Sequence, residues 1–169
     1  MELIKDIKEY EFDDTQMAGS VYFKYLDDYI DLRFDKDIPL EYVQKTAEKL
    51  NAVTEEIMNT LFERSIIYCR SKLDMQPSLK RRIKLDKLKK PSDIMKYMEI
   101  DGLIVNLPED MSQVAVNLEG SCDWEEEDGI QWLIRDDAVV YVGPWADIDI
   151  WYSKAFEDSL CNYAGEDYL

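Results

Sequence analysis

The sequence predicts an α+β fold: a mainly antiparallel sheet with a helix pair packed on one face. Two observations predict it. Apolar and polar residues alternate near both ends of the chain, and between about residues 39 and 72 the apolar spacing changes to three and four. Strand patterns on both sides of helix patterns are typical of this fold class. The 169 residues, 46% of them hydrophobic, are enough for one domain with a packed core, spanning 1–169.

The N-terminal strands are predicted from alternation. Residues 3–12 are apolar and aromatic with interspersed charges, which is typical of an opening strand. Residues 21–25 and 29–34 alternate with period two on either side of Asp27 and Asp28. An Asp-rich turn between two such runs predicts a hairpin with one buried face.

The helix pair is expected over residues 39–50 and 54 to about 72. Pro39 suits a first helical turn, where its missing N–H costs nothing. Thr54 is a good N-cap, and the two glutamates after it favour the positive end of the helix dipole. A solvated face is expected at Tyr42, Lys45 and Lys49, since no cofactor motif accompanies this Tyr–Lys pair.

The second half of the chain predicts further strands. The basic segment after Pro77 has weak alternation, which leaves both a strand and a short helix open. A short helix follows from Pro91 to about Met98. Strands are expected at 100–107, 113–118, 129–135 and 138–142, with a tight hairpin turn at Asp136 and Asp137, and a helix at 149–164.

Charge is sorted along the chain. From Arg70 to Lys90 there are nine bases and two acids, whereas the whole chain carries a net charge of −17. From Asp101 onward there are seventeen acids and two bases. Such an acidic surface repels nucleic acid and attracts cationic partners. The basic strip therefore indicates pairing with the protein's own acidic surface, although phosphate binding by Arg81 and Arg82 is the alternative.

The sharpest local feature is an acidic segment that ends in Gly129. We interpret it as a solvated loop between strands with Trp124 folded back onto the sheet; a protein-binding loop and a metal site are the alternatives, and the spacing does not match an EF-hand. Together with the hairpin acids and an aromatic anchor it gives the expected partner-binding residues: Asp123, Glu125, Glu126, Glu127, Asp128, Asp136, Asp137 and Trp145.

The residue types also restrict the chemistry. The chain has no histidine, which removes Ser–His and Cys–His catalysis and nearly all catalytic zinc designs. Cys69, Cys122 and Cys161 are widely spaced and form no zinc or disulfide pattern, so reduced thiols are expected. No cofactor motif is present, and no catalytic residue or metal ligand is assigned. Among the tryptophans, Trp132 should be buried in the core and Trp145 exposed.

Several short motifs resemble those of an uncharacterised bacterial domain family. They are residues 21–25, 39–42, 50–51 and 67–69, then Cys-x-Trp-x-x-Glu…Gly at 122–129 and Val-Gly-Pro at 142–144. The resemblance implies a strand hairpin and a helix pair, and no established activity. Small acidic bacterial proteins of this kind often occur as immunity proteins beside secreted toxins, which is an analogy.

These observations favour a non-enzymatic, acidic binding protein, possibly an immunity-type inhibitor of a cationic bacterial toxin. The expected partner is a basic protein, with neither nucleic acid nor membrane, because no apolar run approaches the roughly 20 residues that span a bilayer. The charged N-terminus lacks a signal peptide pattern, so the cytoplasm is the expected compartment. The alternatives are a divalent-metal-dependent hydrolase built on the carboxylates at 123–128, and a self-associating structural or regulatory domain.

Overall fold

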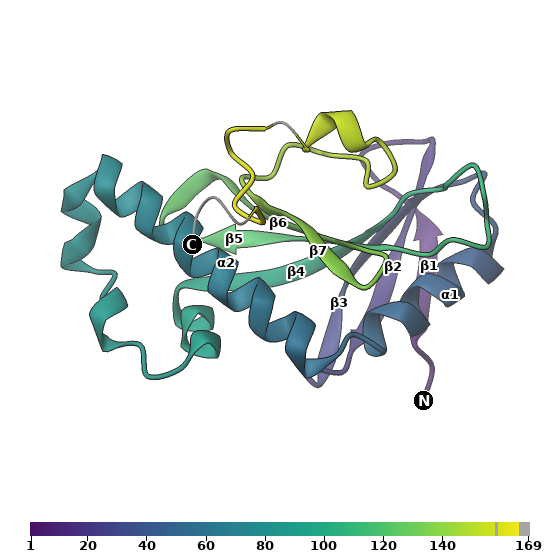
Figure 1. Ribbon diagram of the computed structural model, residues 1–169. Helices are drawn as coiled ribbons and strands as arrows, with labels where there is room; N and C mark the ends of the chain where they lie inside the picture. Colours follow the sequence, from purple (N-terminus) through teal and green to yellow (C-terminus); the bar gives the residue numbers. More distant parts are fainter. Residues whose placement is uncertain (158, 166–169) are drawn as a thin grey trace.

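The structure is a computed structural model that describes residues 1–157 and 159–165. A seven-stranded sheet runs in chain order from β1 to β7, and two α-helices connect β3 to β4 (Figure 1). The strands are β1 (Ile4–Glu9), β2 (Gln16–Phe23), β3 (Asp28–Asp35), β4 (Met98–Val105), β5 (Val116–Cys122), β6 (Glu125–Arg135) and β7 (Ala138–Gly143). The helices are α1 (Leu40–Asn51) and α2 (Glu55–Met75).

The strand pairing follows from the connections. Neighbouring strands joined by short turns pair antiparallel, and only β3 and β4 are parallel, because the two helices lie between them in the chain. The Asp136–Asp137 turn has φ of 55° and 57°, the left-handed values that a two-residue hairpin turn requires. The α+β class and the mainly antiparallel sheet are therefore confirmed.

Buried side chains form two clusters on opposite faces of β6. Trp132 belongs to the larger cluster, where α2 contacts it: its indole N–H donates to Ser65 at 2.9 Å, and its ring lies 6.0 Å from that of Phe62. Leu133 points the other way and packs with Ile148, Ile150 and Phe156 of the C-terminal segment. The alternation within β6 thus places helix contacts on one face and the C-terminal segment on the other.

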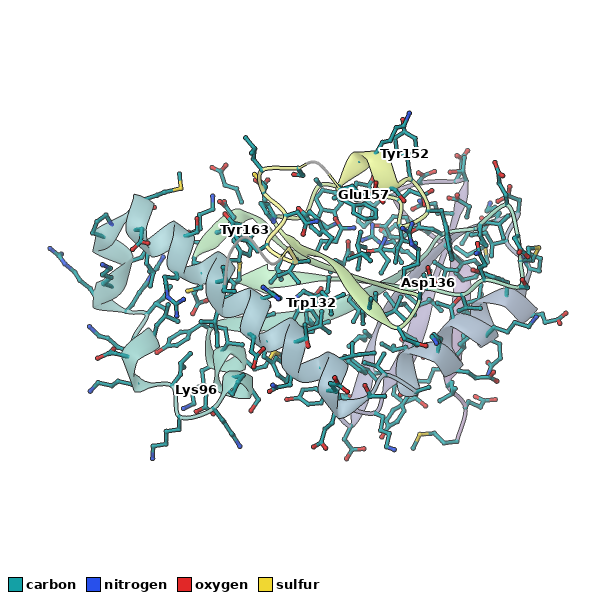
Figure 2. All side chains as sticks on the ribbon, viewed as in Figure 1. Lys96, Trp132, Asp136, Tyr152, Glu157 and Tyr163 are labelled. Carbon is teal, nitrogen blue, oxygen red and sulfur yellow. The ribbon has the colours of Figure 1, made fainter. Side chains whose placement is uncertain are left out.

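The basic strip contains no strand. Beyond the end of α2 it folds as short 3₁₀ helices, η1 (Pro77–Arg81) and η2 (Leu85–Lys87), so of the two alternatives the short helix holds. A third, η3 (Pro91–Tyr97), confirms the short helix expected from Pro91 to about Met98. Ile83 and Ile94 bury their side chains underneath. We call residues 77–97 the basic lobe. It begins at the end of α2 and folds back beneath this helix to reach β4 (Figure 1), and Figure 2 shows Lys96 on it.

Two sequence predictions are wrong. The helix expected at 149–164 is absent from the described residues of that range, which exclude 158; only Ser153–Ala155 form a 3₁₀ turn, since Ile150 and Phe156 pack flat on the sheet while Leu160 is exposed. Tyr42 is not on a solvated face. It is buried, and its hydroxyl donates to the Gln113 carbonyl oxygen at 2.8 Å.

Among the described residues, no helix combines the length and the apolar character needed to cross a membrane.

Candidate functional site

The acidic segment at 123–128 is mostly strand rather than loop. Asp123 and Trp124 form the turn between β5 and β6, and Glu125 to Asp128 belong to β6. Gly129 follows with φ of 69°, and a side chain there would collide with the Gly120 carbonyl oxygen, so the strand can continue only with glycine. The acids are therefore held on a fixed backbone.

Two of these acids pair with bases near the end of α2. Lys72 Nζ lies 2.9 Å from a carboxylate oxygen of Glu125, and Arg82 Nη2 lies 3.1 Å from one of Glu126. The hydrogen bond from Lys72 lowers the pKa of Glu125, and the same bond raises the pKa of Lys72. The sequence prediction that the basic strip pairs with the protein's own acids is confirmed for these two bases.

The predicted partner-binding residues lie in three separate places. The acids at 123–128 and the pair at Asp136 and Asp137 lie at opposite ends of the 11-residue strand β6. At about 3.3 Å per residue, those ends are roughly 35 Å apart. Asp137 pairs with Lys49 of α1 at 2.7 Å, and Trp145 lies beyond the end of β7. The structure therefore does not bring these residues together as one acidic face.

The tryptophans occupy the environments that the sequence predicts. Trp132 is fully buried, whereas Trp145 is 37% exposed. Trp124 is folded inward, with its ring perpendicular to that of Tyr68 at 5.6 Å between centroids. Trp145 is thus available to a partner, while the other two support the core.

Among residues 1–157 and 159–165, no three Asp, Glu, Cys or His side chains are placed to hold one metal ion. Two of the acids at 123–128 instead pair with different bases, Glu125 with Lys72 and Glu126 with Arg82.

Trp145 lines a cavity of about 480 Å³ on the face of the sheet away from Trp132. We call it the strap cavity, after the strap, residues 144–151, that forms one of its walls. The β1–β2 loop forms the opposite wall, and β3, β4 and β5 form the floor. Its ionisable and aromatic lining residues are Tyr10, Phe12, Asp13, Arg33, Phe34, Asp35, Glu119, Trp145, Asp147 and Asp149.

An ion pair that spans β4, between side chains of β3 and β5, forms part of the floor of the strap cavity. Arg33 of β3 pairs with Glu119 of β5, and its guanidinium also lies 5.2 Å from the ring centroid of Tyr10. Between them, Gly102 of β4 leaves room for the Glu119 side chain, since an added Cβ would lie 3.0 Å from Glu119 Cγ. Burial opposes the charge on Arg33, but Glu119 outweighs it and the pKa of Arg33 is raised.

A buried network of amide side chains holds the strap. Gln131, 1% exposed, accepts hydrogen bonds from the backbone N–H groups of Ala146 and Ile148 and donates to Asn117 and to the Ile148 carbonyl oxygen. Asn106 accepts from the N–H of Ile150. Because buried amides of this kind are costly to leave unpaired, the network fixes the wall that carries Trp145.

The strap cavity has the chemistry of a cation-binding site. Five carboxylates and four aromatic rings surround it, against one base, Arg33, that is already paired with one of the carboxylates. Its volume lies within the range of about 300–1,000 Å³ that is typical of ligand pockets. Aromatic faces and carboxylates both attract ammonium and guanidinium groups, so the arrangement suits a Lys or Arg side chain.

The sequence predicted one residue of this cavity, Trp145, and missed the rest. Arg33 and Glu119 look like ordinary solvent-facing positions of alternating strands, and their pairing depends on the parallel β3–β4 contact. One signal was available: Gln131 interrupts the apolar run from Ile130 to Ile134, which indicates a buried polar role.

Fold and cavity together define the class: an α+β domain with an acidic, aromatic-lined cavity on a mainly antiparallel sheet. The chain belongs to the family described as domain of unknown function (DUF6985), whose model matches residues 6–150. All residues that line the strap cavity lie within this match. The searches of curated proteins and of solved structures each found no match to the chain.

Proposed function

We propose that this chain is a non-enzymatic binding protein for a cationic protein, and that a basic side chain of the partner enters the strap cavity. The observation that carries the proposal is the lining of this cavity, five carboxylates and an exposed tryptophan against one paired base. Electrostatic complementarity of this kind speeds association and selects the partner, and a buried aromatic contact supplies affinity.

The concrete form that we propose is an immunity-type inhibitor in the bacterial cytoplasm that masks a cationic toxin surface. A helix pair on one face of the sheet, as the sequence predicts, would leave the other face to the partner. The exposed acids Asp123, Glu126, Glu127, Asp128, Asp136 and Asp137, with the half-buried Glu125, lie outside the strap cavity. Their expected role is to attract the partner over distance. This electrostatic attraction falls off beyond a Debye length of about 8 Å at physiological salt.

Affinity capture with matched baits tests this function. The baits are the wild type, Trp145→Ala, a double variant D147N/D149N, and a control E48Q/E63Q. The control removes the same number of charges from exposed positions of α1 and α2, outside the cavity and outside the acids expected to attract the partner, and asparagine tolerates the left-handed backbone at 147. The captured protein is then purified and its affinity for each variant is measured.

The proposal is supported if a basic protein binds the wild type and the control equally well, and binds both cavity variants at least about tenfold more weakly. Loss of the captured protein's own activity on binding supports the inhibitor form. Equal affinity for all four baits would refute the assignment of the strap cavity.

A further inference from the structure

The strap cavity continues into a second one across the same sheet face. This second cavity, of about 540 Å³, lies over β1, β2 and β3, and we call it the edge cavity. The two share Tyr10, Phe12 and Arg33, which therefore form a ridge between them. The Tyr10 ring meets the Phe12 ring edge-on at 5.6 Å between centroids, and Phe12 is 79% exposed.

The edge cavity is also acidic, though less strongly. Apart from the paired Arg33, its charged lining residues are Asp6, Glu11 and Asp31 against Lys8. Its floor is formed by the small residues Ala18, Gly19 and Ser20 of β2, which leave space for a side chain from above. Both cavities thus offer more negative than positive charge, on either side of an exposed aromatic ridge.

Two adjacent cavities on one face match the geometry of an extended peptide. Alternate residues of an extended chain point to the same side and are about 6.7 Å apart, whereas consecutive residues point to opposite sides. A chain that crosses the ridge can therefore place residues i and i+2 in the two cavities, while its backbone lies on the exposed Phe12 ring.

We propose that the strap cavity and the edge cavity form one groove that holds an extended segment of the cationic partner, with a basic side chain in each cavity at positions two residues apart. This inference rests on the proposed function and adds to it the conformation and spacing of the recognised segment. The occupant is a segment of a basic protein, because the charge excess of both cavities is complementary to Lys and Arg.

Two peptides of identical composition test the spacing. One is acetyl-Ala-Arg-Ala-Arg-Ala-amide, and the other is acetyl-Ala-Arg-Arg-Ala-Ala-amide, so that net charge is constant and only the spacing differs. Binding is measured by calorimetry and by the fluorescence of the tryptophans. The first, spaced peptide should bind at least about tenfold more tightly than the second, because its second arginine binds within a complex that the first arginine has already formed. Equal affinities would refute the recognition of an extended segment by both cavities and would not contradict the proposed function.

Variants assign the two cavities separately. The double variant D147N/D149N removes two carboxylates of the strap cavity, and Asp31→Asn removes one of the edge cavity. Each should reduce the preference for the spaced peptide, whereas the control E48Q/E63Q, which lies outside both cavities, should leave it unchanged. Circular dichroism melts establish that each variant is folded, so a lost preference reports the cavity.

The alternative occupant of the groove is a second copy of this chain, and these measurements distinguish it from a different basic protein. The basic lobe of a second copy of this chain also carries closely spaced bases, and it would compete for the groove. Sedimentation that shows a salt-sensitive oligomer, lost in D147N/D149N, together with no binding of either peptide, would overturn the proposal in favour of self-association. Binding of the captured basic protein with no preference between the peptides would show that the proposed function holds without the extended segment.

Discussion

At the scale of single residues, Gln131 connects the core to the candidate site. Its side chain is 1% exposed and satisfies backbone groups of Ala146 and Ile148 in the strap. We predict that Gln131→Ala lowers the free energy of unfolding by about 2–3 kcal/mol, because it leaves buried polar groups without partners. Urea denaturation measures this loss.

The matched control is Gln44→Ala on α1, where the side chain is only partly buried and contacts Glu48. Its effect should lie within about 0.5 kcal/mol. The Gln131 variant should also weaken binding of the spaced peptide, since the strap that carries Trp145 is released. A variant with wild-type stability and wild-type binding would show that the amide network does not hold the strap.

Two carboxylates should have opposite effects on stability. The hydrogen bond from Lys72 lowers the pKa of Glu125, so the charged form stabilises the fold, and this contribution is lost as pH falls through the folded-state pKa. Partial burial, then Glu119, Glu99 and Asp31, raise the pKa of Asp101, so its stabilising contribution is present at low pH and is lost as pH rises through the folded-state pKa.

We therefore predict that at pH 7 Glu125→Gln destabilises the protein by about 0.5–1 kcal/mol, whereas Asp101→Asn stabilises it slightly. Both differences should shrink as the pH is lowered from 7 toward 3, because protonation removes the charge of each carboxyl. Thermal melts of both variants across this pH range measure the signs. Effects of the same sign at pH 7 would contradict the assigned environments.

At the scale of elements, the capping of α2 is a local feature that the sequence predicts correctly. Thr54 accepts a hydrogen bond from the N–H of Ile57 at 3.2 Å. We predict that Thr54→Ala costs about 1 kcal/mol of stability, because a helix N-terminus loses one partner. Thr60→Ala, within the same helix, is the control; it should be neutral or slightly stabilising, since alanine is the better helix former. Urea denaturation of both variants tests the pair.

Elements with a clear period were predictable, and those without one were not. Alternation and three-to-four spacing located both helices and the strands, with ends displaced by a few residues. The helix prediction for 149–164 is wrong because Ile150 and Phe156 pack on a sheet face, where long-range contacts override local spacing. The strap cavity was not predicted for a related reason. Its walls come from residues 10–16 and 145–149, which only the sheet topology brings together.

At the scale of the whole molecule, charge is separated by position. The basic lobe follows the end of α2 and folds back beneath this helix (Figure 1). Figure 2 shows Asp136, just after the C-terminal end of β6, far from Lys96 of the lobe. The net charge of −17 implies repulsion among acids that opposes the compact state. Local pairs such as Lys72–Glu125 act in the opposite direction, and the balance between the two decides how the protein responds to salt.

We predict that repulsion dominates, so that raising NaCl from about 0.02 M to about 0.5 M increases the urea midpoint, since the Debye length falls well below the size of the molecule. The same change should weaken binding of the spaced peptide, because that contact joins opposite charges. Stability and affinity should therefore change in opposite directions over one salt series.

Charge variants test the cause. The triple variant K87Q/K89Q/K90Q, at exposed residues of the basic lobe, makes the chain three charge units more negative. It should steepen the rise of stability with salt. A second triple variant removes three exposed acids and should flatten it: E2Q/D14N/E109Q. A urea midpoint that falls with NaCl in the wild type would mean that attractive pairs, rather than the excess of acids, govern the electrostatics of this fold.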